Sequence, residues 1–208
     1  PQPYPSVYTA EEILKIENGV DQNSSHGKRD YAALLLATRL GIRSGDISSM
    51  TFEELDFTGN LIRLTQHKTG IAIELPMVSD VKDALKRYLQ EERIRCDSPY
   101  VFLRTVPPYN HISVQAITKI VRTAIAAAGI DPDGRKQGPH AFRSSLASSM
   151  VNDSIPYEVV RKTLGHTDQN AIRSYARLDL EQLRGYAIPV MEATGTFAAF
   201  LEGRYSLS

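Results

Sequence analysis

The sequence predicts an α+β fold that is predominantly helical and contains a small three-stranded antiparallel sheet. Amphipathic stretches bounded by helix start and stop signals run along most of the chain, whereas residues 52–76 change to short strand-like segments separated by turns. The 208 residues include 42% hydrophobic residues, which is enough for one well-filled core. We therefore expect a single folded domain to account for most of the chain.

The first helices are predicted from their end signals. Thr9 followed by Glu12 is a capping-box pattern, and it predicts a helix that ends at Gly19. The run "KRDYAALLLATRLG" (residues 28–41) predicts a buried helix that stops at its last glycine, and "SGDISSM" begins another helical turn just beyond. Arg43 is therefore expected at a junction between two helices.

The sheet is predicted from three segments, "FEELDF", "LIRLTQ" and "IAIELP". The turn sequences "TGN" and "HKTG" separate them, which is the pattern of an antiparallel meander. Lys68 is expected in the second of these turns.

Four helices are predicted after the sheet. Ser79 is expected to cap the first, which ends before "CDSP", and the second runs from about Ser113 to Ala128. Pro139 and Pro156 suit the first turns of the other two, and Gly165 closes the last.

Two pairs of side chains could carry chemistry. His140 and Arg143 are three residues apart near a helix N-terminus, where free amides and the helix dipole favour a phosphate. Tyr175 follows His166 by nine residues. Taken singly, each has a structural explanation: a surface histidine beside a salt-bridging arginine, or a tyrosine that packs in the core.

Five short motifs, taken in their order along the chain, favour a catalytic explanation over these structural ones. The motifs are Arg43 in "GIRSGDI", Lys68 in "HKTG", His140 and Arg143 in "HAFR", His166 in "LGH", and Tyr175. Their order and spacing resemble the catalytic domain of the tyrosine recombinases, the phage integrase family, over roughly residues 8–180. The resemblance implies the catalytic fold of that family and cleavage of DNA.

The chemistry of these side chains suits such a reaction. A tyrosine hydroxyl has a pKa of about 10, so only about one in a thousand is ionised at neutral pH. As a nucleophile it needs help from a base, which His140 could supply, or from strong positive charge nearby. Arg43 and Arg143 provide two planar guanidiniums that can clamp a phosphodiester as negative charge develops on its oxygens. Lys68 is expected to protonate the departing sugar oxygen as the general acid.

The resemblance adds further expectations. Tyr175 forms a 3′-phosphotyrosyl bond and releases a 5′-hydroxyl, no metal or other cofactor takes part, and His166 donates a hydrogen bond to the phosphate. Asp46 stands where the family commonly has an acidic residue, and its carboxylate is expected to orient Arg43.

We expect three segments along the chain. Residues 1–8, rich in proline, look like the remnant of a linker from an N-terminal DNA-binding domain, and residues 9–180 form the catalytic domain. Residues 181–208 form a helical tail that docks either on its own core or on a neighbouring protomer. The expected partners are double-stranded DNA and further copies of the chain, in a tetramer on that DNA.

The amino-acid composition alone excludes few classes of protein. The 24 basic and 24 acidic residues balance, so net charge does not indicate a nucleic-acid partner. A lone Cys96 and the lack of a long apolar run predict a cytoplasmic protein with no disulfide framework and no membrane span, at the nucleoid when bound to DNA. Two alternatives stay open: DNA relaxation of the type IB topoisomerase kind, and a DNA-binding protein of the same fold that does not cleave.

Overall fold

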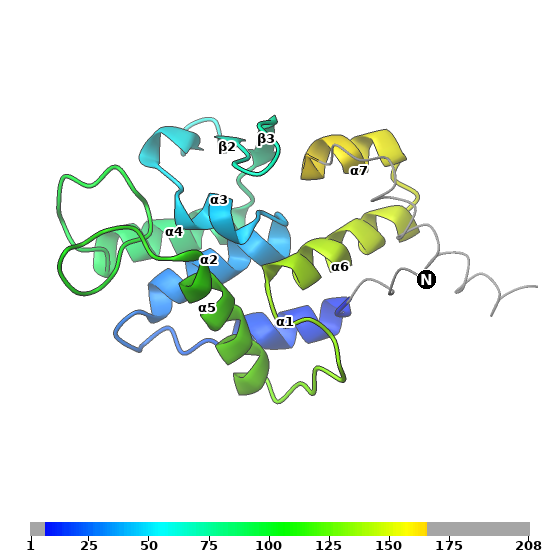
Figure 1. Cartoon of the computed structure of the whole chain (residues 1–208), viewed down its shortest axis with the longest axis horizontal. Coiled ribbons are helices and arrows are strands. Elements are labelled where there is room, and N and C mark those ends of the chain that lie inside the picture. Colours follow the sequence, from blue (N-terminus) through cyan, green and yellow to red (C-terminus); the bar gives the residue numbers. More distant parts are fainter. Residues whose placement is uncertain (1–6, 166–208) are drawn as a thin grey trace, which may run out of the picture.

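The computed structural model describes residues 7–165. Its elements confirm a mostly helical α+β fold with one small sheet (Figure 1). In chain order they are α1 (Ala10–Asn18), α2 (Gly27–Arg39), α3 (Ser44–Ser48), the 3-10 helix η1 (Phe52–Glu54), β1 (Leu55–Asp56), β2 (Leu61–Thr65), β3 (Ala72–Pro76), α4 (Ser79–Glu91), α5 (Val114–Ala127), α6 (Pro139–Asn152) and α7 (Tyr157–Leu164).

Helix α2 lies at the centre of the fold. Every side chain from residue 32 to residue 38 is buried, so this helix is covered on all sides and contacts α1, α3, α4, α5 and α6. A helix that is apolar all round belongs in the interior of a protein. The Thr9 capping box and the end of α1 at Gly19 are as predicted, and so is the end of α2 just before Gly41.

The sheet is the predicted antiparallel meander, in the order β1-β2-β3. Ile62 and Leu64 on β2 are buried, as are Ile73 and Leu75 on β3, while the residues between them face outward. One face of the sheet therefore belongs to the core. The turn between β2 and β3 contains Lys68, as expected.

Two local predictions were wrong. The first predicted strand is half helical, because Thr51 and Glu54 form a capping box that folds residues 52–54 into η1 and leaves only Leu55–Asp56 as β1. Ser79 does not cap α4. Val78 occupies the cap position, and the Ser79 hydroxyl instead donates to the Asp80 carboxylate.

Helix α7 is held to α6 by a small apolar cluster of its own. Ala147 and Val151 of α6 pack with Val160 and Leu164 of α7, and all four are buried. Helix α7 also contacts β3, so it lies against both α6 and the sheet (Figure 1). The C-terminal end of α7 is thereby fixed next to both.

Phe142 tests the packing of α6 against the core. Its side chain is fully buried on α6 and lies 5.6 Å from the Tyr8 ring, between centroids. We expect Phe142→Ala to lower the free energy of unfolding by about 3–5 kcal/mol in chemical denaturation, because the cavity cannot refill. The matched control is Phe52→Ala at an exposed phenylalanine, which should cost below about 1 kcal/mol; equal losses would contradict this assignment of the core.

Candidate active site

Arg43 lies at the predicted helix junction, as the residue that precedes α3. One guanidinium nitrogen, Nη1, donates to the side-chain oxygen of Gln66, and Nη2 donates to the Gly165 carbonyl at 3.4 Å. Burial lowers the pKa of Arg43 and the Asp46 carboxylate acts in the opposite direction. Arginine nevertheless stays protonated at neutral pH, so this is a partly desolvated positive charge, which favours an anionic ligand.

Arg143 reaches the same place from α6. It is only 4% exposed, and its Nη1 donates to the Gly41 carbonyl at 2.9 Å. Its Nη2 donates to the Leu164 carbonyl, next to the carbonyl that Arg43 contacts. The structure therefore brings the two predicted clamp arginines together, because they donate to the carbonyls of two consecutive residues, Leu164 and Gly165, at the end of α7.

That end is a left-handed turn at Gly165. Its φ is +59°, and its N–H closes the helix on the carbonyls of Arg161 and Lys162. A Cβ at this position would overlap the side chain of Gln66. Glycine is thus required twice, by the backbone conformation and by the close approach. The next residue in the chain is His166.

Lys68 lies in the exposed turn between β2 and β3, and Asp46 supports that turn. The Asp46 side chain is buried, and its Oδ1 accepts a hydrogen bond from the His67 backbone N–H at 2.9 Å. Among residues 7–165, no partner hydrogen-bonds its Oδ2. Asp46 acts on Arg43 through charge across space, so its expected role in orienting Arg43 stays a prediction.

His140 is the second residue of α6, one turn before Arg143. It is exposed, and its Nδ1 lies 3.4 Å from the Ser144 hydroxyl. His166, Tyr175 and the predicted C-terminal tail lie outside the described residues, so their assigned roles stay predictions. Within the described range, no helix is long and apolar enough to cross a membrane.

Gln66 is the residue that the sequence analysis missed. Its side chain is 1% exposed and contacts Arg43, Thr69 and Leu164. A signal for it was present in "LIRLTQ", because the alternation that buries Ile62 and Leu64 also points residue 66 inward. The pattern predicts a buried apolar side chain at this position, so a glutamine there indicates that its amide makes specific hydrogen bonds.

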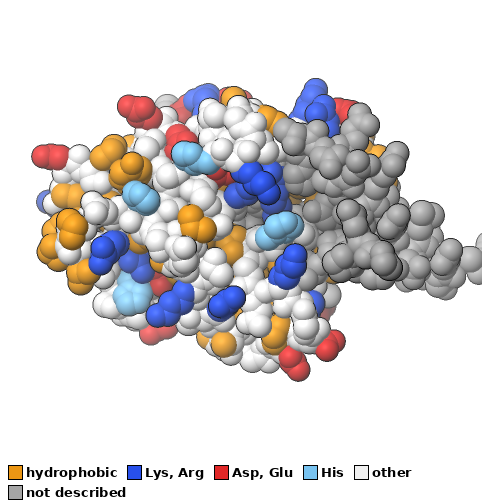
Figure 2. Space-filling model, in the orientation of Figure 1, with side chains coloured by type: hydrophobic (Ala, Val, Ile, Leu, Met, Phe, Trp, Pro, Cys, Tyr) orange, Lys and Arg blue, Asp and Glu red, His pale blue; other side chains and the backbone are white. Residues whose placement is uncertain are grey.

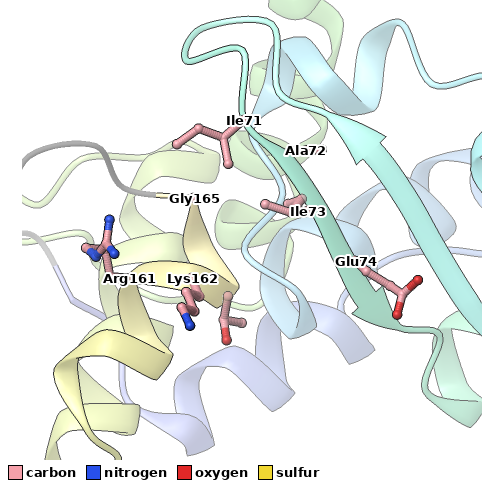
Figure 3. Close-up of a pocket in the computed structure, with 8 residues that line it drawn as sticks. Ile71, Ala72, Ile73, Glu74, Arg161, Lys162 and Gly165 are labelled. Carbon is pink, nitrogen blue, oxygen red and sulfur yellow. The ribbon is translucent and has the colours of Figure 1, made fainter.

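An open groove of about 370 Å³ lies between β3 and α7, and Gly165 is among the residues that line it. Figure 3 shows Gly165 at the end of α7, across from Ile71 and Ile73. Arg161 and Lys162 line the groove opposite Glu74, whose carboxylate is already paired with Arg63. Arg43 and Arg143 do not line it, so the groove is a neighbour of the site and not the site itself.

Comparison with known proteins identifies the family of the chain. The family model described as the phage integrase family matches residues 6–182. The chain belongs to the phage integrase family. It is 31% identical over 185 residues to y4gC of Sinorhizobium fredii, a protein named for integrase/recombinase activity, and the match covers 88% of this chain and 95% of y4gC.

The chain spans only part of the length of two other proteins that it matches. Tyrosine recombinase XerA of Pyrococcus furiosus is 24% identical, over 88% of this chain and 61% of its own length. The crystal structure of XerH recombinase in a post-cleavage complex with a palindromic difH substrate superposes with a TM-score of 0.74 at 19% identity. That match covers 88% of this chain and 53% of XerH, and it confirms the fold.

The Gly165 turn can be tested by stability. We expect Gly165→Ala to lower the free energy of unfolding by about 2–4 kcal/mol, since the strained φ and the overlap with Gln66 add. Gly129→Ala is the matched control, because Gly129 has a φ of +65° and its surroundings leave open space within 4 Å of where a Cβ would lie. It should cost only about 1–2 kcal/mol, and equal losses in urea denaturation would show that the close approach to Gln66 is unimportant.

Proposed function

We propose that this chain cuts and rejoins double-stranded DNA as a tyrosine site-specific recombinase of the integration and excision type. The observation that supports this most directly is the convergence of Arg43 and Arg143 on the Leu164–Gly165 turn. Two guanidiniums from distant parts of the chain meet there. His166 is the next residue after Gly165, and Tyr175 follows nine residues later.

The arginines form the phosphate clamp. Attack on a phosphodiester builds negative charge on the non-bridging oxygens, and preorganised guanidiniums stabilise that charge without having to reorganise. Partial burial of Arg43 strengthens the effect, because charges interact more strongly where water is excluded.

The proposed reaction begins with the Tyr175 hydroxyl. Its oxygen attacks phosphorus, its proton passes to His140 as the base, and the bond from phosphorus to the 5′ oxygen breaks. Lys68 gives the proton that makes this oxygen a 5′-hydroxyl, while His166 donates a hydrogen bond to the phosphate. The 3′-phosphotyrosyl bond keeps the energy of the broken linkage, so a 5′-hydroxyl from another strand reverses the step.

One face of the described part of the molecule suits a polyanion. Figure 2 shows Lys, Arg and His side chains gathered across the middle of one face, while Asp and Glu lie mostly toward its edges. The chain as a whole has balanced charge, but the basic side chains are concentrated in the middle of this face, which favours contacts with phosphates. We propose double-stranded DNA as the partner, a tetramer as the recombining assembly, and the cytoplasm, at the nucleoid, as its location.

The nucleophile can be tested by covalent trapping. Duplexes covering the DNA on either side of the gene, each nicked near a candidate cleavage point, should yield a denaturant-resistant protein–DNA adduct. Tyr175→Phe should reduce the adduct below detection, because no other hydroxyl is expected at the phosphorus. Tyr157→Phe, at an exposed tyrosine on α7, is the control and should retain the wild-type yield.

Two outcomes would contradict this assignment. An equal adduct with Tyr175→Phe would exclude Tyr175 as the nucleophile, and binding of the same duplexes without any adduct would favour a non-cleaving DNA-binding protein. Relaxation of supercoiled DNA without strand exchange would instead favour a type IB topoisomerase activity.

The general acid can be tested with a modified leaving group. We expect Lys68→Ala to slow cleavage about 10²–10⁴-fold. A duplex with sulfur in place of the bridging 5′ oxygen should restore the rate, because a thiol with a pKa near 8.5 leaves without help from an acid. Lys15→Ala, at an exposed lysine on α1, is the control; no recovery on the sulfur substrate would remove Lys68 from this role.

A further inference from the structure

Gln66 makes hydrogen bonds to three parts of the site at once. Its Oε1 accepts from Arg43 Nη1 and from the Thr69 hydroxyl at 2.9 Å, and its Nε2 donates to the Leu164 carbonyl at 3.0 Å. We propose that Gln66 is a positioning residue that sets the relative placement of the phosphate clamp, the Lys68 turn and the end of α7. This inference rests on the proposed function.

Each of the three contacts lies next to a group assigned to the chemistry. Thr69 follows Lys68 in the β2–β3 turn, and that turn closes on the Gln66 backbone, since the N–H groups of Thr69 and Gly70 both donate to the Gln66 carbonyl. Arg43 is contacted directly. Leu164 precedes Gly165 and His166 in the chain. A displacement of one residue in this set is therefore transmitted to the others.

Burial makes the arrangement rigid. The side chain is 1% exposed and continues the inward face of β2 after Ile62 and Leu64. A buried amide costs free energy unless its polar atoms are paired, so Gln66 is restricted to the orientation that satisfies all three hydrogen bonds. Gly165 completes the fit, because a side chain there would occupy the same space.

The chemistry of the position selects glutamine. A carbonyl oxygen accepts from a guanidinium without cancelling its charge, whereas a carboxylate would form an ion pair and weaken the clamp on phosphate. The amide nitrogen must also donate to a backbone carbonyl, which neither an ionised glutamate nor a methionine can do. Glutamine alone among side chains of this length meets both requirements.

The first test separates positioning from binding and from stability. Gln66→Met keeps the volume and removes all three side-chain hydrogen bonds. We expect the cleavage rate of bound nicked duplex to fall at least about 10-fold, while the affinity for that duplex changes less than about 3-fold. Two controls accompany it: Gln90→Met at an exposed glutamine of α4, and Thr38→Val, which deletes a buried hydrogen bond to Glu17.

Thr38→Val matches the loss of a buried hydrogen bond away from the site, so it should lower the melting temperature without lowering the cleavage rate. If it slows cleavage as much as Gln66→Met does, the effect is one of general stability and the positioning role is overturned. An unchanged rate in Gln66→Met overturns it as well.

The second test uses the charge of the side chain. In Gln66→Glu the ionised carboxylate loses the donor to Leu164 and forms an ion pair with Arg43, which keeps the carboxyl ionised near neutral pH. The affinity for the nicked duplex should therefore fall further than in Gln66→Met, because the ion pair neutralises part of the clamp. An affinity no lower than that of Gln66→Met would contradict direct contact with Arg43.

Failure of the proposed function is distinguishable from failure of this inference. Absence of an adduct in the wild-type protein would overturn the function alone. Hydrogen exchange without DNA would still decide the positioning claim: amides of residues 67–70 and 163–165 should exchange faster together in Gln66→Met, with those of α4 unchanged. Faster exchange in neither segment, or in only one, would overturn it.

Discussion

The carbonyl of Leu164 is the point on which the candidate site depends. It lies at the C-terminal end of α7, where helix carbonyls lack partners within the helix and carry the negative end of the dipole. Arg143 and Gln66 both donate to it, so a guanidinium from α6 and the amide of the residue that follows β2 satisfy one acceptor. The apolar α6–α7 cluster and the left-handed Gly165 turn place this carbonyl within their reach.

The same contacts explain how the positive charge of the proposed phosphate clamp is held in place. Backbone carbonyls of Gly41, Leu164 and Gly165, and the neutral amide of Gln66, orient the arginines through dipoles. Dipoles fix a guanidinium without forming the ion pair that a carboxylate would form, so the proposed clamp keeps its attraction for phosphate. Asp46 is used differently, since its buried carboxylate binds the backbone of the Lys68 turn.

Most features set by local sequence could be predicted, whereas features set by distant contacts could not. The capping box at Thr9, the turn at Gly165 and the alternation in β2 depend on residues a few positions apart. Gln66 was missed because its partners Arg43 and Leu164 lie 23 and 98 residues away along the chain. The first strand was mispredicted because the Thr51–Glu54 capping box competes locally with strand pairing.

The most direct test of the proposed reaction is to identify the amino acid that becomes bonded to DNA. A trapped adduct, digested with nuclease and trypsin, should give a nucleotide-bearing peptide of residues 174–177, "SYAR", with the nucleotide on Tyr175 through its 3′-phosphate. The freed DNA end should accept a kinase label, as a 5′-hydroxyl does. A nucleotide on any other residue, or a protein bonded to the 5′ end, would contradict the account.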